Sequence, residues 1–208
     1  MYRLYGAKGS GSAMVEAALA ETGAAYEVAA VGLGTDEQRG ESYRELNPTR
    51  KIPALVLPSG AVIAESAAIL ITLAERHPES KLLPSMGSDE RAQALRWLVS
   101  IVAEIYPMIE IRDYPKRFAI GEKNEETIIN IARNRARERW LSIERAIAGS
   151  PWLLPTGFSI ADLAIANVSR WTIGKDWRIA NLSKIEAIHA GILARPKAGK
   201  VWASHFGA

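Results

Sequence analysis

The spacing of apolar residues changes near Glu65, and this change constrains the fold more than any other feature of the sequence. Residues 2–63 mix short extended runs with helical segments, whereas nearly everything after Glu65 carries apolar side chains at helical spacing. Proline, glycine and polar residues gather at residues 79–86, as is typical of a linker. We therefore predict an α+β domain over residues 1–78, followed by an all-α helical domain over residues 87–208.

The first domain is predicted to alternate strands and helices in the order βαβ-α-ββα. A glycine-rich turn at residues 6–11 separates the first strand from the first helix, and Gly23 closes that helix. A second turn, at residues 58–60, joins the strands of a hairpin. The predicted elements are a strand at 2–5, a helix at 12–22, a strand at 26–31, an irregular or helical link at 36–46, a hairpin of strands at 54–57 and 61–63, and a helix from Glu65.

Two long helices are predicted in the second domain, because apolar residues recur at helical spacing over residues 95–109 and 128–147. Pro107 is expected to kink the first of them, since proline removes a backbone donor and clashes with the preceding turn. Ser159 and Asp162 have the spacing of a capping box that opens a third helix: the hydroxyl oxygen accepts a backbone N–H and the acid reaches back. Later helices are predicted at residues 183–194 and 196–204.

The composition removes several classes of function. The 208 residues contain no cysteine, which excludes disulfides, thiolate metal sites and covalent chemistry on the protein's own sulfur, so any thiol must arrive with a ligand. The three histidines lack ligand spacing, and we expect no metal. A net charge of +3 is too mild to indicate nucleic-acid binding by itself. The four arginines within residues 133–139 share their helix with Glu125, Glu126 and Glu138, which indicates a solvated face rather than a nucleic-acid site. With no signal peptide and no run of about 20 apolar residues, we expect a cytoplasmic protein with no membrane contact.

Two short motifs could bind parts of a peptide-like ligand. Pro53 stands directly before a predicted strand; a cis peptide there would turn the backbone of Ile52 outward as an edge for pairing, although the proline could simply start the strand. Ser66 opens a helix, where its hydroxyl and the helix's N–H groups suit a carboxylate, and Glu65 beside it suits an ammonium. Together they describe a site for an amino-acid head group, with a plain helix cap as the alternative.

A third motif, residues 9–12, places two hydroxyls at the positive end of the first helix. Its sequence, Gly-Ser-Gly-Ser, fits neither the dinucleotide-binding pattern nor the phosphate-binding loop. A hydroxyl at this place could donate a hydrogen bond to a thiolate. A serine nucleophile of the hydrolase kind is disfavoured, because the sequence places no base beside it.

In this order, and followed by a helical half with its late capping box, the three motifs resemble the cytosolic glutathione transferase family over nearly the whole chain. The resemblance implies a thioredoxin-like domain followed by a helical domain, in a protein that is usually a homodimer. It also implies that Ile52, ahead of a cis Pro53, faces the cysteinyl part of glutathione, and that Glu65 and Ser66 hold the γ-glutamyl end. Lys51 would face the glycyl carboxylate, with Arg50 or Arg39 as alternatives.

The residue that activates the thiol is left open among three hydroxyls. The family uses a tyrosine, a serine or a cysteine in this region, and cysteine is absent here. Ser10 lies nearest the serine position, Ser12 is at the helix cap and Tyr5 falls near the tyrosine position, which gives the order Ser10, Ser12, Tyr5. No metal or other cofactor is needed, because a hydroxyl and a helix dipole suffice to lower a thiol pKa.

The leading hypothesis is a transferase that conjugates the sulfur of glutathione to a hydrophobic electrophile. Tyr106, beside Pro107, is a candidate for the hydrophobic substrate pocket, since pockets favour domain junctions. One alternative is a protein of the same fold that binds a ligand or a partner without catalysis. Another is an enzyme that uses glutathione as a reductant for peroxides or disulfides.

Overall fold

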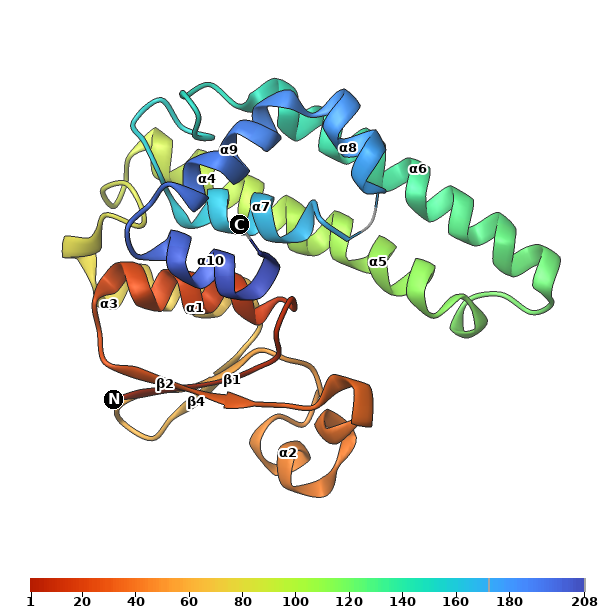
Figure 1. The fold of residues 1–208 in the computed structure, drawn as a ribbon, viewed down its shortest axis with the longest axis horizontal. Coiled ribbons are helices and arrows are strands. Elements are labelled where there is room, and N and C mark those ends of the chain that lie inside the picture. Colours follow the sequence, from red (N-terminus) through yellow and green to blue (C-terminus); the bar gives the residue numbers. More distant parts are fainter. Residues whose placement is uncertain (172, 208) are drawn as a thin grey trace. The chain divides into compact units, whose positions relative to one another are not determined.

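The computed structural model describes residues 1–171 and 173–207. Tertiary contacts divide the chain into two compact units (Figure 1). The first unit contains Met1–Leu83 together with Ile192–Ala208, and the second contains Pro84–Gly191. The return of the C-terminal segment to the first unit is not part of the domain boundaries predicted from the sequence.

Within the described residues of the first unit, four strands form one mixed sheet in the order β2-β1-β3-β4. β1 (Tyr2–Gly6) pairs in parallel with β2 (Tyr26–Ala30) and antiparallel with β3 (Ala54–Val56), which in turn pairs antiparallel with β4 (Val62–Ala64). Parallel strands need a crossover, and α1 (Ser12–Thr22) supplies it. The helix ends at Gly23, whose φ of 73° is left-handed and which returns its N–H to the carbonyl of Ala20.

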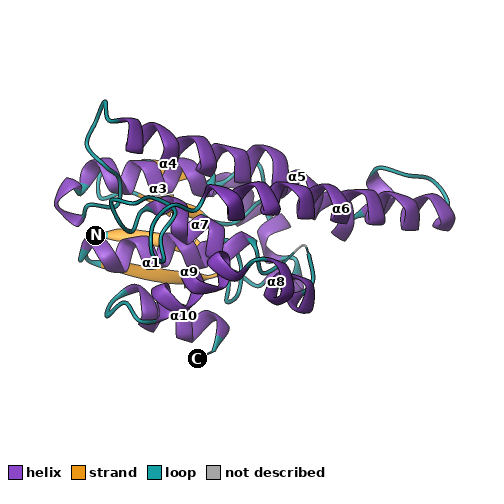
Figure 2. Cartoon of the chain, turned by 90° about the horizontal axis from the view of Figure 1, so that it is seen from above, coloured by secondary structure: helices purple, strands orange, loops and turns teal. Residues whose placement is uncertain are grey.

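Helices of the first unit cover one face of this sheet (Figure 1). Seen from above, α1 and α3 (Ser66–Arg76) lie side by side over the strands (Figure 2). Leu4 of β1 and Leu55 of β3 are opposite one another in register and both fully buried, because the residue-by-residue alternation of a strand turns them to the same face. α2 (Glu41–Leu46) follows two short 3-10 turns, and α10 (Ala198–Phe206) packs against α1.

The second unit is built of helices, with one isolated β-bridge between Leu154 and Gly157 among its described residues. Its core contains fully buried side chains such as Leu98, Trp140 and Leu163, and every residue of the central helix over residues 160–168 is buried. The elements are α4 (Asp89–Ser100), a π-helical segment (Ile101–Ile105), α5 (Tyr106–Asp113), α6 (Glu122–Ala146), α7 (Ile160–Val168), α8 (Lys175–Asn181) and α9 (Ser183–Leu193), the last of which runs into the first unit.

The helix that contains Pro107 departs from regular α-helix immediately before the proline. The N–H of Tyr106 bonds to the carbonyl of Ile101, five residues back, and Pro107 then stands in the first turn of α5. A proline is tolerated there because the first N–H groups of a helix need no partner inside it. The interruption predicted at Pro107 therefore takes the form of a π-helical segment.

The predicted α+β order of the first half and the helical second half are confirmed. The short helix α8 was not predicted, and the last helix runs from Ala198 to Phe206, later than the predicted 196–204. In the part of the chain that the structure describes, no helix is both long and apolar enough to cross a membrane.

Candidate functional site

Sheet register brings three loops together at one end of the sheet. Tyr5, next to the last residue of β1, pairs with Ala54, the first residue of β3, and Ala54 pairs with Ala64, the last residue of β4. The loop after β1, the residue before β3 and the residue after β4 therefore lie at the same end. These are the segments that carry the hydroxyl motif, Pro53 and Glu65.

The β1–α1 loop holds its two serines in a shared set of hydrogen bonds. Ser10 Oγ donates to the carbonyl of Ala7 over 2.7 Å and lies 2.9 Å from Ser12 Oγ. Ser12 Oγ also lies 3.1 Å from both the carbonyl and the N–H of Ala7. The tight packing requires a glycine at position 6, since a Cβ there would lie 2.4 Å from Ser12 Oγ. Both hydroxyls therefore lie within hydrogen-bond distance of one carbonyl, that of Ala7, in the loop before α1.

The three candidate hydroxyls differ in exposure and surroundings. Ser12 is buried, with 1% of its surface exposed, whereas Ser10 is half-buried. Tyr5 is half-buried on β1; its ring meets that of Tyr43 edge-on at 6.2 Å, and the guanidinium of Arg3 lies 5.3 Å from its centre. Ser10 is therefore the more exposed of the two serines, whereas Ser12 lines the pocket beside the loop.

The loop before β3 is held by two residues that the sequence analysis did not single out. The carbonyl of Lys51 accepts from Tyr43 Oη at 2.9 Å and from Asn47 Nδ2 at 2.7 Å. Asn47 Oδ1 in turn accepts from the N–H and the hydroxyl of Thr49. Burial raises the pKa of Tyr43 to about 12, so its hydroxyl remains a donor at neutral pH. The Asn-Pro turn is the sequence signal that could have identified Asn47.

These bonds fix the backbone that leads into Pro53. The Ile52–Pro53 peptide is cis, Pro53 is buried and Ile52 packs against the cluster that contains Tyr43. Lys51 and Arg50 are both exposed on this loop. Arg39, in contrast, lies in a 3-10 turn and pairs with Asp36 at 3.3 Å.

Glu65 has an unusual backbone conformation directly before α3. Its φ of 67° and ψ of 110° are outside the regions that a non-glycine residue ordinarily occupies, and such strain costs about 1–3 kcal/mol and gathers at functional sites. Glu65 is exposed and, as the N-cap residue, makes no side-chain cap bond. Ser66 follows as the first residue of the helix, with 8% of its surface exposed.

The remaining candidates lie in the second unit. The ring of Tyr106 meets that of Trp171 edge-on at 6.1 Å. Ser159 and Asp162 form the capping box of α7: one carboxylate oxygen accepts from the N–H of Leu153 at 2.7 Å, and the other accepts from the N–H and hydroxyl of Ser159. Burial raises the pKa of Asp162 to about 6 against the lowering effect of these bonds. The box joins the start of α7 to the preceding loop.

No metal centre is found among residues 1–171 and 173–207, since no group of three or more His, Asp or Glu side chains there is placed to hold an ion.

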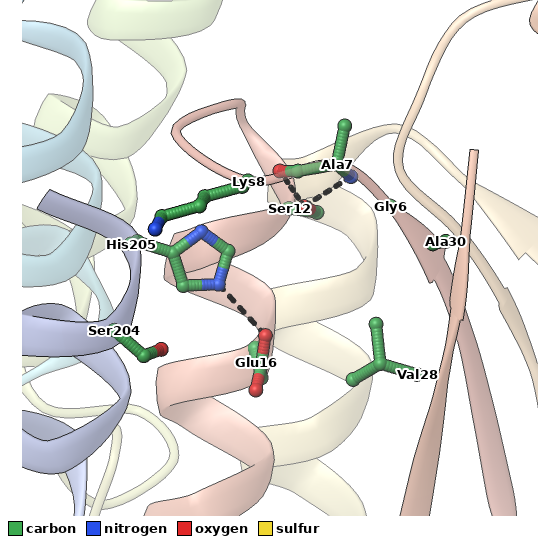
Figure 3. A pocket seen from close by; sticks show the side chains of 9 residues that line it. All are labelled: Gly6, Ala7, Lys8, Ser12, Glu16, Val28, Ala30, Ser204 and His205. Carbon is green, nitrogen blue, oxygen red and sulfur yellow. Dashed lines mark hydrogen bonds and ion pairs between the residues drawn. The ribbon is translucent and has the colours of Figure 1, made fainter. Parts of the chain in front are cut away.

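A pocket of about 230 Å³ opens on the β2 side of the β1–α1 loop (Figure 3). Loop residues, α1, β2 and the end of α10 line it.

Comparison with known proteins matches residues 12–76 to the model of the glutathione S-transferase N-terminal domain. Residues 12–76 belong to the glutathione S-transferase N-terminal domain family. Among relatives from Escherichia coli, an uncharacterized GST-like protein is 28% identical, with 97% of each chain covered. A glutathione S-transferase from the same species is 26% identical with 86% of each covered, and a disulfide-bond oxidoreductase is 29% identical with 84% of this chain and 82% of that protein covered.

Solved structures of the glutathione S-transferase family share the architecture. A sphingomonad glutathione S-transferase complexed with glutathione has a TM-score of 0.80 at 26% identity, covering 99% of this chain and all of that one. A glutathione transferase homologue from Sulfitobacter with bound glutathione has a TM-score of 0.87 at 23% identity, covering 97% of this chain and 96% of that one; it supports the fold. The thioredoxin-like fold followed by helices, predicted from the sequence, is thereby confirmed.

Proposed function

We propose that this protein binds glutathione at the end of the sheet where the three loops meet, and transfers its sulfur to a hydrophobic electrophile. The observation that carries the proposal is this convergence: a half-buried hydroxyl just before α1, a backbone with a cis peptide just before β3 and a serine at the start of α3. A peptide with an amino-acid head group, a thiol and a terminal carboxylate suits these groups in turn.

Each part of glutathione has a proposed partner. The hydroxyl of Ser66 and the first N–H groups of α3 would bind the γ-glutamyl carboxylate, and Glu65 its ammonium. The backbone of Ile52, before the cis Pro53, would pair with the cysteinyl residue. Lys51 would face the glycyl carboxylate. Arg50, exposed on the same loop, is the nearer alternative, since Arg39 is engaged by Asp36.

Ser10 is the proposed thiolate stabiliser, and the shared hydrogen bonds of the loop support this choice over Ser12. Each hydroxyl has one proton, and both lie within hydrogen-bond distance of the Ala7 carbonyl. When Ser10 turns its proton to a bound sulfur, the hydroxyl of Ser12 still satisfies that carbonyl, so no buried acceptor is lost. Ser12 is the more buried of the two, with 1% of its surface exposed. Tyr5 remains the third candidate.

The reaction needs little else from the protein. The thiol loses its proton to solvent, and the hydroxyl hydrogen bond with the positive end of α1 favours the anion. The thiolate then attacks an electrophilic carbon, forming the C–S bond while the leaving group departs with its bonding electrons. Tyr106 is the proposed residue of the hydrophobic substrate pocket, and a homodimer in the cytoplasm is the proposed working form.

Serine variants test the assignment. We expect Ser10→Ala to leave glutathione affinity nearly unchanged but to raise the pH at which the bound thiolate absorbs in the ultraviolet. Tyr5→Phe is the matched control and should leave that pH unchanged, whereas Ser12→Ala should raise it less than Ser10→Ala does, because the Ala7 carbonyl then loses its second donor. A shift in the Ser12 or Tyr5 variant, with none for Ser10, would move the role to that residue.

One relative favours a second candidate function. The disulfide-bond oxidoreductase is 29% identical across most of the chain. With bound glutathione as the thiol, the same site could reduce a disulfide or a peroxide, two glutathione thiols being oxidised to one disulfide. Turnover of a disulfide by the protein with glutathione, in the absence of conjugation to electrophiles, would select this candidate.

A further inference from the structure

The β1–α1 loop is bonded to the last helix of the chain through His205. The N–H of Gly9 donates to Nδ1 of His205 over 3.1 Å, a contact between residues 196 positions apart. The other ring nitrogen, Nε2, lies 2.8 Å from a carboxylate oxygen of Glu16 on α1 (Figure 3). The side chains of His205 and Glu16 are 7% and 17% exposed, so water competes little for either bond.

The two bonds define which nitrogen of the ring carries the proton. Nδ1 must offer its lone pair, because a backbone N–H can only donate. The ring proton is therefore on Nε2 and points to Glu16, which accepts it. In this arrangement the carboxylate orients the imidazole, and the imidazole holds the loop.

The helix that carries His205 is fixed by contacts of its own. Arg195 forms a double hydrogen bond with the carboxylate of Glu21 on α1, at 3.0 and 2.8 Å, and the N–H of Ala198 donates to the same carboxylate. Burial alone would raise the pKa of Glu21, but Arg195 and the Ala198 N–H together hold it below its usual value. Trp202 is 1% exposed on the same helix. α10 therefore remains in place when the ring of His205 is changed.

The Gly9 amide, which donates to His205, belongs to the residue just before Ser10, the proposed thiolate stabiliser. Gly9, with a left-handed φ of 72°, precedes Ser10, and the N–H of Ser10 closes a turn onto the carbonyl of Ala7. The position of the Gly9 amide thus decides where the Ser10 hydroxyl lies. We propose that His205, oriented by Glu16, is a positioning residue that holds the β1–α1 loop so that Ser10 meets the bound sulfur. This inference rests on the proposed function.

Two near-isosteric variants separate this role from a merely structural one. In His205→Asn, the amide oxygen takes the place of Nδ1 and can still accept from Gly9, but the contact with Glu16 is lost. In His205→Gln, the amide nitrogen takes the place of Nε2 and can still donate to Glu16, but the acceptor for Gly9 is lost. If His205 served only to attach α10 to α1, the Gln variant would be the conservative one.

The first readout is hydrogen exchange of the Gly9 amide by NMR, which needs no ligand. The second is the pH at which bound glutathione ionises, with kcat and KM for an activated aryl chloride. We expect His205→Gln and His205→Ala to lose Gly9 protection and to lower kcat about three- to tenfold at fixed pH, the effect of one lost hydrogen bond, with KM for glutathione little changed. His205→Asn should resemble the wild type.

The control is Ser204→Ala. Ser204 lines the pocket of Figure 3, as His205 does, but its hydroxyl donates to the carbonyl of Val201 within its own helix. The control variant should change neither readout. Wild-type behaviour of the Gln variant, or a loss in the Asn variant equal to that in the Ala variant, would overturn the proposal. If the wild type itself forms no shifted thiolate, the proposed function fails, while Gly9 exchange still reports whether His205 holds the loop.

Discussion

Replacing Asp162 tests how much of the second unit's stability depends on the capping box of α7. The carboxylate is fully buried and accepts three hydrogen bonds, from the N–H groups of Leu153 and Ser159 and from the Ser159 hydroxyl. It is ionised at pH 7, above its raised pKa of about 6. One side chain therefore satisfies two buried backbone donors from different segments.

The expected loss in the free energy of unfolding follows from the number of buried donors that each substitution leaves without an acceptor. Each buried unsatisfied donor costs about 1–3 kcal/mol. Asp162→Ala leaves two backbone N–H groups and should reduce the free energy of unfolding by about 2–6 kcal/mol, whereas Asp162→Asn keeps one acceptor and should reduce it by about 1–3 kcal/mol. Ser159→Ala removes only the hydroxyl and should cost about 1 kcal/mol.

Urea unfolding at pH 7, followed by circular dichroism, measures these differences. Asp89→Asn is the matched control, because Asp89 is also in the first turn of a helix but is exposed, and its loss should cost only about 0.3–1 kcal/mol. We expect the loss in the free energy of unfolding to be largest for Asp162→Ala, smaller for Asp162→Asn, smaller again for Ser159→Ala and smallest for the control. An Asp162→Ala variant as stable as the control would refute the argument that these buried donors depend on Asp162.

Three further predictions concern the binding site and acid stability. Ser66→Ala should weaken glutathione binding by about 1–3 kcal/mol in calorimetry, the cost of depriving a charged group of one hydrogen bond, and an unchanged affinity would remove its assigned role. Asn47→Ala should weaken binding more than Tyr43→Phe, because Asn47 holds both the Lys51 carbonyl and the turn after it; equal effects in calorimetry would contradict this. Burial, and then nearby arginines, lower the pKa of His189 from 6.5 to about 3, so its contribution to stability is present above pH 6.5 and is lost as the pH falls. Between about pH 6.5 and 5 the wild type should lose about 2 kcal/mol more than His189→Gln in urea unfolding, and equal losses would contradict the burial argument.

Local signals predicted the fold well. The helix end at Gly23 and the turn before Ala61 follow from left-handed backbone conformations at Gly23 and Gly60, which few residues other than glycine adopt. The spacing of Ser159 and Asp162 likewise identifies the start of α7. Capping and turn signals involve residues that are only a few positions apart in the sequence, so a single sequence is enough to recognise them.

The contacts that hold the site were not predictable in the same way. Tyr43 and Asn47 reach the Lys51 carbonyl only because α2 folds back on the loop, and nothing in the spacing of these residues specifies that return. His205 meets Gly9 across almost the whole chain. The sequence analysis placed no histidine near the hydroxyl motif for this reason, since such a neighbour is defined by tertiary packing.

An ultraviolet difference titration of glutathione against the protein across pH, with affinity measured by calorimetry, tests the central claim most directly. The proposal predicts saturable binding and a thiolate absorbance that appears below the pKa of a free thiol, about 8.5. Binding without a shifted thiolate would contradict the transferase and favour a ligand-binding protein of this fold, and the absence of binding would contradict the glutathione site itself.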